Sequence, residues 1–458
     1  MSNHPPTHRP WPRRWKLLFL AGGVLFLLVA PLAPPAGPSR NPLARPRLGS
    51  CAAAADANCT PDCGPLPPDR YPALHRAKHL ARLGADRWHA AGFRGKGIKV
   101  AILDSGFRGY KEHLGKALPA RVLARSFRSD GNLEARDSQH GILCGEVLHA
   151  LAPEADLLFA NWEPDRSDQF LQAVRWAREQ GVKVISCSII MPSWSDGEGR
   201  GPVHQALGRL LGDGNKAGDL LCFASAGNVA QRHWAGPFRD TGDGWHAWVP
   251  GQRDNLVRPW GDERVSLEMC WSGSARYELS VADARTGREV CRSAAVCEDR
   301  CGAVARFQPE PHRTYMVRVR LVGGEPGRFH LSCLGGGMRH ATTAGSIPFP
   351  GDGPEVIAVG AVSEEGRRVN YSSCGPCSAG PKPDLTAVVP FPSLWRPRPF
   401  AGTSAAAPQA AGLAALLWSK HPDWTASQVR AALGKAAVDL GPPGHDCETG
   451  YGMIRLPE

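Results

Sequence analysis

The stretch that decides the fold is Gly402-Thr403-Ser404-Ala405-Ala406-Ala407-Pro408, which runs directly into an Ala/Leu-rich segment ending near Trp418. Glycine permits a tight turn, and the apolar segment after it predicts a buried helix. The hydroxyl of Ser404 would then lie at the positive end of the helix dipole. A nucleophile is expected at such a position, so Ser404 is the first candidate catalytic residue.

A serine hydroxyl needs a base to activate it and a further group to orient that base. Residues 98–103 form a short apolar run that is typical of a buried parallel strand. Asp104 follows this run at the carboxyl end, where open α/β sheets carry their active groups. His140 begins a second apolar helix that runs toward residue 152. The sequence therefore predicts Asp104 as the orienting carboxylate and His140 as the general base.

An acyl intermediate also requires a hydrogen-bond donor directed at its oxyanion. The apolar run at residues 221–226 predicts another strand, which ends at Gly227 and Asn228. The side-chain amide of Asn228 is suited to this role.

Four motifs together carry a resemblance to a known family. They are Asp104-Ser105-Gly106, His140-Gly141, Ala226-Gly227-Asn228 and the Gly-Thr-Ser-Ala-x-x-Pro stretch around Ser404. Each motif alone is typical of an ordinary turn or helix start, but in this order they resemble the subtilisin-like serine proteases. The resemblance covers about residues 80–228 and 340–458. It implies a serine endopeptidase with Asp104, His140 and Ser404 as its triad and Asn228 as its oxyanion residue.

Between these motifs, strand patterns alternate with helix patterns. Strands are expected at residues 156–160, 182–190 and 355–362, and helices at residues 167–179 and 203–211. Such alternation predicts parallel strands with helices on both faces. The expected fold class is α/β, a subtilisin-like doubly wound parallel sheet flanked by helices, with an inserted small all-β domain.

The resemblance also implies which residues hold the substrate. They are Ala226, Gly227 and a strand edge that in this family usually reads Ser, apolar, Gly, but that here reads Ser188, Ile189, Ile190. If Ile190 projects into the cleft, the first specificity pocket is narrowed. Small or unusual side chains before the scissile bond are then favoured over large aromatic ones.

Residues 229–339 do not fit the protease pattern, because the family needs only a short connection after its oxyanion residue. Alternating runs such as 265–269, 277–281 and 314–322, separated by Gly, Pro and Asp turns, predict a small antiparallel β-sandwich or jelly roll. A structural or substrate-gating domain and a binding module both fit this insertion. Four tryptophans in it are interpreted either as core aromatics or as a stacking platform: Trp245, Trp248, Trp260 and Trp271.

The N-terminus indicates export. Basic residues precede an apolar run at residues 17–30, which is the layout of a secretory signal peptide and is short for a membrane span. Residues 1–36 are interpreted as a signal peptide or an uncleaved anchor, and residues 37–70 as a Pro/Gly-rich linker. Residues 71–228 and 340–458 are expected to form the catalytic domain. The protein is expected to be secreted or held in the cell envelope, in contact with a membrane only if the anchor persists.

The charge distribution argues against nucleic acid as a partner. The net charge is +11, but seven of these charges lie in residues 1–50, which contain no acidic residue. The remainder is only mildly basic, whereas nucleic-acid binding needs a basic face. The expected partners are protein or peptide substrates. No cofactor or metal is needed for the chemistry, structural calcium is left open, and the oligomeric state is not predicted.

The fourteen cysteines of an exported chain suggest some disulfides. We expect the insertion to be cross-linked within the set Cys270, Cys291, Cys297, Cys301 and Cys333, whereas Cys144, Cys187 and Cys222 are expected to be free buried thiols. Cys374 and Cys377 predict a small disulfide or a coincidental spacing rather than a redox site. His75 and His79 are taken as surface residues. The rival function is an exported pseudo-protease that acts as a binding or adhesion module through its β insertion.

Overall fold

The computed structural model describes residues 72–135, 138–294 and 302–458, all of which belong to one compact unit, Cys51–Glu458. The predicted signal segment and linker, residues 1–70, lie outside the described residues. Among the described helices, none combines the length and the apolar character that a membrane span requires.

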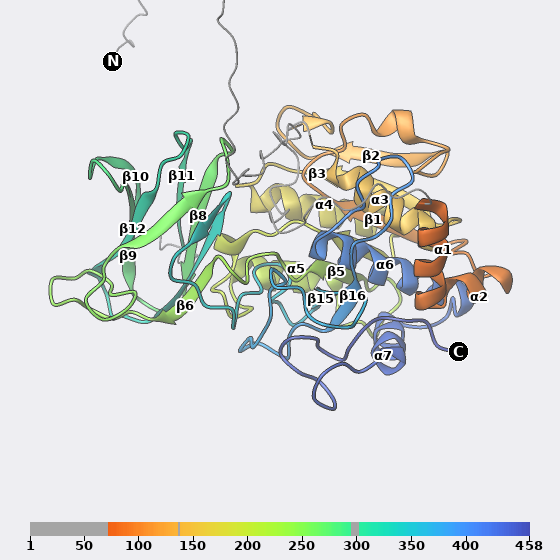
Figure 1. Cartoon of the computed structure of the whole chain (residues 1–458). Helices are drawn as coiled ribbons and strands as arrows, with labels where there is room; N and C mark the ends of the chain where they lie inside the picture. The colour runs from red at the N-terminus through yellow and green to blue at the C-terminus, as the bar shows by residue number, and fades with distance from the viewer. Residues whose placement is uncertain (1–71, 136–137, 295–301) are drawn as a thin grey trace, which may run out of the picture. The chain divides into compact units, whose positions relative to one another are not determined.

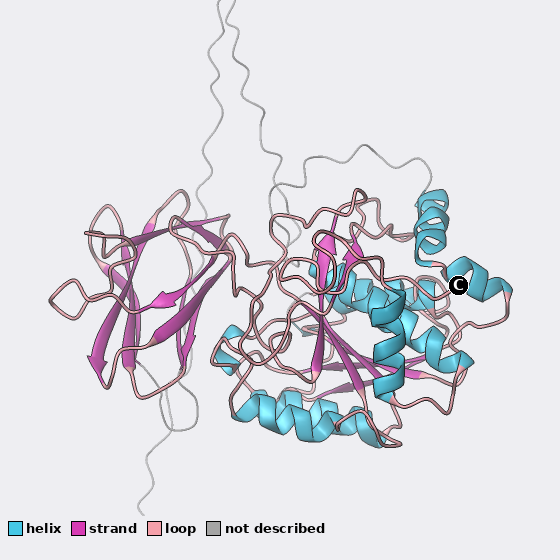
Figure 2. Ribbon diagram, turned by 90° about the horizontal axis from the view of Figure 1, so that it is seen from below, coloured by secondary structure: helices cyan, strands magenta, loops and turns pink. Residues whose placement is uncertain are grey.

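A seven-stranded sheet forms the centre of the molecule, and its described pairings are all parallel (Figures 1 and 2). The strand order is β16-β15-β5-β4-β1-β3-β2. The strands are β1 (Lys99–Leu103), β2 (Val122–Ser126), β3 (Asp156–Asn161), β4 (Val184–Cys187), β5 (Leu221–Ser225), β15 (Val356–Val362) and β16 (Leu385–Val388). The chain changes direction across the sheet between β1 and β4, and in open sheets this switch point opens a crevice for ligands.

Helices cover both faces of this sheet (Figure 2). They are α1 (Pro72–Leu83), α2 (Ala85–Ala90), α3 (His140–Leu151), α4 (Ser167–Glu179), α5 (Pro202–Leu211), α6 (Thr403–Lys420) and α7 (Ala426–Ala436), with short 3₁₀ turns η1 (Tyr110–His113) and η3 (Pro192–Trp194). Alternate residues of β1 face opposite layers: Val100 and Ile102 join the core with α3 and α6, whereas Ala101 and Leu103 join the core with α4 and α5. The predicted doubly wound α/β fold is therefore confirmed.

The predicted insertion contains an antiparallel β-sandwich, as expected (Figure 1). One sheet has the order β10-β9-β12-β7-β14 and the other β11-β8-β13-β6, with a shared apolar core between them. The strands are β6 (His233–Pro237), β7 (Asn255–Pro259), β8 (Val265–Trp271), β9 (Arg276–Asp283), β10 (Glu289–Ala294), β11 (Gly302–Phe307), β12 (Tyr315–Gly323), β13 (Arg328–Leu334) and β14 (Gly336–Met338). Trp248 and Trp271 are buried in that core, so for these two the core interpretation is confirmed.

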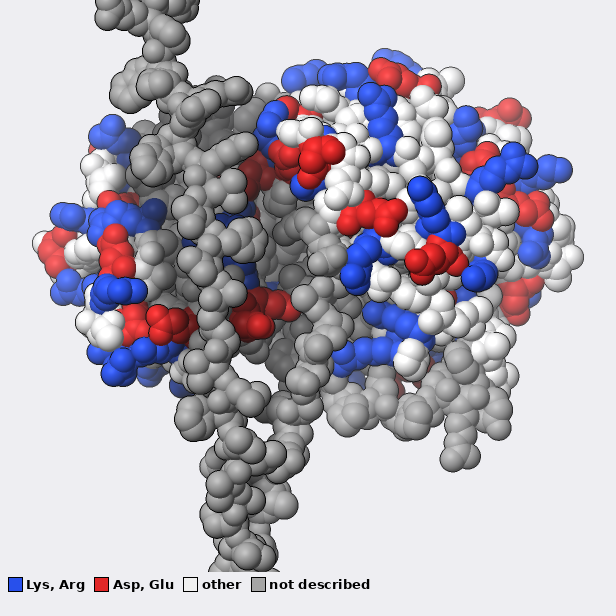
Figure 3. Space-filling model, turned by 90° about the horizontal axis from the view of Figure 1, so that it is seen from above, with Lys and Arg blue, Asp and Glu red and all other residues white. Residues whose placement is uncertain are grey.

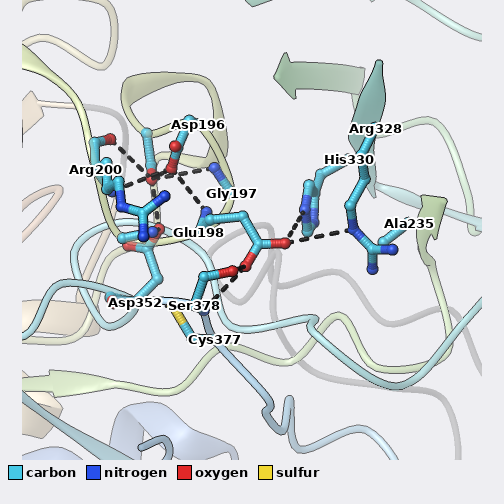
Figure 4. Close-up of polar contacts among 12 residues, drawn as sticks. Asp196, Gly197, Glu198, Arg200, Ala235, Arg328, His330, Asp352, Cys377 and Ser378 are labelled. Atoms are coloured by element: carbon cyan, nitrogen blue, oxygen red, sulfur yellow. Dashed lines mark hydrogen bonds and ion pairs between the residues drawn. The ribbon is translucent and has the colours of Figure 1, made fainter. Parts of the chain in front are cut away.

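The sandwich is attached to the parallel-sheet layer by polar side chains (Figure 4). Glu198, in the loop after β4, accepts hydrogen bonds from His330 of β13 at 3.2 Å and from the Ser378 amide at 3.0 Å, and its carboxylate lies 3.3 Å from Arg328 Nε. The hydrogen bond from His330, followed by those from Ser378, lowers the pKa of Glu198 to about 2. Arg306 of β11 forms a second link, because it pairs with Asp165 at 2.6 Å.

Charged side chains are mixed rather than segregated on the face seen in Figure 3, where Lys and Arg alternate with Asp and Glu over the described surface. A surface of this kind carries no large field of a single sign there.

One expectation about a single residue is wrong. His79 is buried rather than exposed, because α1 packs against α6 and the His79 ring hydrogen-bonds Gln409 at 2.8 Å. Burial lowers the pKa of His79. His75 is exposed, as predicted.

The disulfides expected in the insertion are also absent where they can be examined. Cys270, Cys291 and Cys333 are free thiols, and Cys270 and Cys333 are buried as small apolar residues of the sandwich, while Cys297 and Cys301 lie outside the described residues. Cys374 and Cys377 are free as well, because their sulfurs contact different loops, at the carbonyl oxygens of Thr343 and Asp352. The prediction of free buried thiols at Cys144, Cys187 and Cys222 is confirmed.

Candidate active site

The four predicted catalytic positions lie at one edge of the parallel sheet. Asp104 directly follows β1, and Asn228 lies in the loop after β5. His140 is the first residue of α3, and Ser404 is in the first turn of α6. Because parallel strands end at the same edge, residues separated by up to three hundred positions are brought together at the switch point.

Asp104 and His140 form a buried pair. Nδ1 of His140 lies 2.9 and 2.8 Å from the two carboxylate oxygens of Asp104. Asp104 also accepts a hydrogen bond from the Ser105 amide at 2.7 Å. With Nδ1–H donating to the carboxylate, Nε2 is the ring nitrogen available as a base, and it has no hydrogen-bond partner in the described part of the chain.

Burial and two buried neighbours, Asp104 and Cys144, act in opposite directions on the pKa of His140. Burial by itself lowers the pKa of His140, but the neighbouring carboxylate, together with Cys144, outweighs burial. The net result is a pKa of His140 well above its ordinary value. A base becomes charged when it accepts a proton, so the raised pKa means that the site stabilises the imidazolium form of His140.

Ser404 lies in the same cluster but does not hydrogen-bond His140. Its hydroxyl donates to the carbonyl oxygen of Ser188 at 3.4 Å, and the Ser188 hydroxyl donates to the carbonyl oxygen of Ser404 at 3.0 Å. The buried thiol of Cys144 lies 3.6 Å from Asp104 Oδ2, 4.0 Å from His140 Nδ1 and 3.8 Å from the Ser404 carbonyl oxygen. The three predicted triad residues thus surround one sulfur atom. The missing hydrogen bond between Ser404 and His140 does not argue against a triad, because catalytic hydrogen bonds are often incomplete before substrate binds.

The loop before α6 fixes the orientation of Asn228. Its side-chain oxygen accepts hydrogen bonds from the Thr403 amide at 3.0 Å and the Thr403 hydroxyl at 2.8 Å. The donor end, Nδ2, consequently lies on the side of Gly402, where a Cβ would approach it to 2.9 Å. Gly402 has φ 87, so its backbone conformation and this close approach both favour glycine. Thr403 was not singled out from the sequence, although it lies inside the deciding motif.

The predicted substrate-binding residues are mostly buried. Gly227 is closely covered, since a Cβ there would lie 2.9 Å from Cδ of Pro348. Ala226 packs against Ile347 and Ala358, and Ile190 is 8% exposed. Ser188 is buried and Ile189 is half-buried. The strand predicted at residues 182–190 ends earlier, at Cys187, so Ser188, Ile189 and Ile190 extend beyond it.

The donor atoms of Asp104, His140 and Cys144 lie within 4.8 Å of one another, so this set has the ligand types that hold a metal ion. The same atoms already contact one another, which accounts for the cluster without an ion. Phe400 contributes a further group that the sequence did not indicate: its ring lies 5.5 Å from the His140 ring in an edge-on arrangement.

Comparison with known proteins gives the family. The model of Peptidase S8, the subtilase family, matches residues 95–256 and 324–452, which is more than half of the chain. The chain belongs to the subtilase family. The two matched segments contain all four predicted catalytic residues of this subtilase, and the interval between them falls within the β-sandwich.

Individual relatives match shorter parts of this subtilase. Subtilisin E of Bacillus subtilis (strain 168) is 34% identical over 117 residues, which are 24% of this chain and 29% of subtilisin E. Subtilisin DY of Bacillus licheniformis is 40% identical over 96 residues, which are 21% of this chain and 35% of subtilisin DY. The chain thus spans about a third of the length of these relatives.

Among solved structures, the Clostridium perfringens CspB protease shares the fold. Its TM-score is 0.58 at 14% sequence identity, and the match covers 83% of this chain and 97% of that protein.

Proposed function

We propose that this subtilase is an exported serine endopeptidase that hydrolyses peptide bonds through an acyl-enzyme. The observation that carries the proposal is the buried Asp104–His140 pair, in which Nε2 of His140 has no partner among the described residues. Ser404 lies beside this pair, because the Cys144 thiol contacts Asp104, His140 and the Ser404 carbonyl oxygen. An imidazole held by a carboxylate next to a serine at a helix N-terminus is an arrangement suited to acyl transfer.

In the proposed reaction, Oγ of Ser404 turns from the Ser188 carbonyl, attacks the scissile carbonyl carbon and passes its proton to Nε2 of His140. Asp104 keeps the imidazole in the correct tautomer and stabilises its charged form. Nδ2 of Asn228 and the Ser404 amide donate to the oxyanion. His140 then protonates the leaving amine. A water molecule, deprotonated by His140, attacks the acyl carbon, and His140 returns this proton to Oγ of Ser404 as the acid product leaves.

This chemistry uses side chains and water only, and structural calcium stays an open question. The expected substrates are proteins or peptides in an extracytoplasmic compartment. The predicted signal or anchor at residues 1–36, which bears on export, lies outside the described residues.

We further propose that the pocket for the residue before the scissile bond accepts small side chains. Pro348 covers Gly227, and the branched side chain of Ile190 is almost fully buried beside Ser188. In this proposal both side chains border the pocket and reduce its volume. Cleavage profiling of a peptide library tests this, and a strong preference for Phe or Tyr at that position would refute it.

The experiment that tests the endopeptidase itself is labelling of the purified protein with a fluorophosphonate, followed by mass-spectrometric mapping of the modified residue. We expect a single adduct on Ser404 and none in Ser404→Ala, with peptide hydrolysis lost in the same variant. Ser105, whose hydroxyl contacts Asp104 at 3.2 Å, provides a neighbouring control serine. A correctly folded wild-type protein that takes no label would favour the non-catalytic alternative, a pseudo-protease acting through its β-sandwich.

A further inference from the structure

Arg232 is a buried arginine next to the proposed oxyanion residue. It directly precedes β6 and is 2% exposed. Its Nε donates to the carbonyl oxygen of Asn228 at 2.9 Å, so the guanidinium lies against the same residue whose side chain is proposed to bind the oxyanion. It also lies over the Trp260 ring, 4.4 Å from the ring centroid.

The rest of the guanidinium is unsatisfied. Nη1 and Nη2 are both buried and have no hydrogen-bond partner among residues 72–135, 138–294 and 302–458. Burial lowers the pKa of Arg232 to about 10, with Cys333 and Glu263 acting in the opposite direction, so the side chain still carries its charge at neutral pH. An isolated buried charge is unfavourable for folding, and an apolar side chain of similar size is commonly tolerated better.

The unfavourable burial of the Arg232 charge has an explanation if that charge takes part in the reaction. Negative charge develops on the oxyanion in the transition state, and a fixed cation in a poorly solvated position beside it lowers the energy of that state more than the energy of bound substrate. A carboxylate paired directly with Arg232 would cancel this effect, and the described residues supply none within ion-pair distance.

We propose that Arg232 is a positioning and electrostatic residue of the oxyanion site, held in place by the β-sandwich. The sandwich supplies Trp260, on whose face the guanidinium rests, and the Cys333 amide, which donates to the Arg232 carbonyl oxygen at 2.9 Å. The insertion is thereby built into the environment of Asn228 instead of being a detached module. The inference rests on the proposed endopeptidase function.

The test is Arg232→Met in the full chain, compared with a matched arginine that is paired. Arg306 of β11 pairs with Asp165 of the parallel-sheet layer and with Glu268 of β8 within the sandwich. For Arg232→Met we expect kcat to fall about tenfold or more with KM within twofold, and the rate of fluorophosphonate labelling to fall by a similar factor. The melting temperature should be unchanged or higher.

The control should behave in the opposite way. Arg306→Met removes the ion pairs to Asp165 and Glu268, so we expect a lower melting temperature and an unchanged kcat. Arg232→Lys retains a positive charge and should keep more of kcat than Arg232→Met. Glu263→Gln removes the nearest named carboxylate and should leave kcat unchanged or slightly raised.

Several results would overturn the inference. One is a kcat for Arg232→Met within twofold of wild type. Another is a rise in KM with no fall in kcat. A third is a fall in melting temperature like that of Arg306→Met with no change in kcat. If Arg232→Met does not fold, Arg232→Gln replaces it under the same criteria. If wild-type protein takes no label, the proposed function fails and the inference falls with it. If wild type labels and Arg232→Met labels equally fast, only the inference fails.

Discussion

At the scale of single residues, the site depends on which atom of each side chain is already engaged. Both carboxylate oxygens of Asp104 contact Nδ1 of His140, and Thr403 engages the oxygen of the Asn228 amide. The atoms proposed to act in the chemistry are Nε2 of His140 and Nδ2 of Asn228. Each can be tested by a substitution that changes one atom's role.

Asn228→Ala removes the side-chain donor to the oxyanion. We expect kcat to fall by roughly 10²–10³ with little change in KM, because the hydrogen bond is made mainly in the transition state. Thr403→Val, which removes one of the two hydrogen bonds that orient Asn228, should cost less, and Thr403→Ser should be close to wild type. Steady-state kinetics on a peptide amide measures all three, and a normal kcat for Asn228→Ala would exclude the assigned role.

The pH dependence of activity follows from the His140–Asp104 pair. The base must be neutral to accept a proton, and its pKa is raised well above 6.5, so the acid limb of kcat/KM should lie well above pH 6.5. Asp104→Asn removes the charge that raises this pKa and leaves the opposing effect of burial. We expect the acid limb to move to lower pH and kcat to drop by about 10⁴. An acid limb that stays in place in Asp104→Asn would contradict this account.

At the scale of elements, two helices begin at residues that are typical of helix starts, a capping threonine before α7 and a glycine before α6. α7 starts after Thr425, whose hydroxyl accepts from the Gln428 amide, while the Gln428 side chain accepts from the Thr425 amide at 2.8 Å. The long helix α6 begins at Thr403, directly after Gly402, and is buried along nearly its whole length, which anchors Ser404 to the rigid core.

Thr425→Ala removes the capping hydroxyl of α7. We expect the free energy of unfolding to fall by about 1 kcal/mol, because an amide at the helix start loses its acceptor. Thr425→Ser keeps the hydroxyl and should be nearly neutral. Urea unfolding followed by circular dichroism measures both, and kcat should not change, since α7 contributes none of the four proposed catalytic residues. Equal stability of the Ala and Ser variants would show that the cap contributes nothing.

At the scale of the whole molecule, polar contacts join the parallel-sheet layer to the β-sandwich (Figure 4). Glu198, His330 and Arg328 join the loop after β4 to β13, and Arg306 joins β11 to Asp165. The same loop follows the strand edge proposed to bind substrate, so the junction and the cleft share a backbone segment.

Glu198→Gln tests how much this junction contributes to stability. The folded-state pKa of Glu198 is about 2, below its ordinary 4.5, so the charged form contributes stability above pH 4.5 that is lost as the pH falls toward 2. We expect the variant to be less stable than wild type at pH 7 by about 1 kcal/mol, because solvent screens this partly exposed carboxylate. The difference should shrink between pH 4.5 and 2. Thermal unfolding across this range measures it, and a difference that does not vary with pH would contradict the assignment.

Local sequence patterns predicted the elements that carry long apolar runs or clear caps. Helix α4 has the predicted bounds, and β1, β3, β5 and β15 agree with their predictions to within about a residue at each end. Strands β2 and β16 were not predicted. β2 alternates half-buried and exposed residues at the sheet edge, and β16 has only four residues, so neither has the apolar run that identifies a central strand.

The sequence by itself determined the fold class, the family and the four candidate catalytic residues, because each of these is encoded in a short contiguous motif at the end of a strand or the start of a helix. Tertiary structure alone decided the rest. His79 became buried when α1 packed on α6, Pro348 came to cover Gly227, and Arg232 came to lie against Asn228 with Trp260 beneath it. These are contacts between segments joined only by folding, and no local periodicity or propensity reports the burial, pairing or charge that such contacts produce.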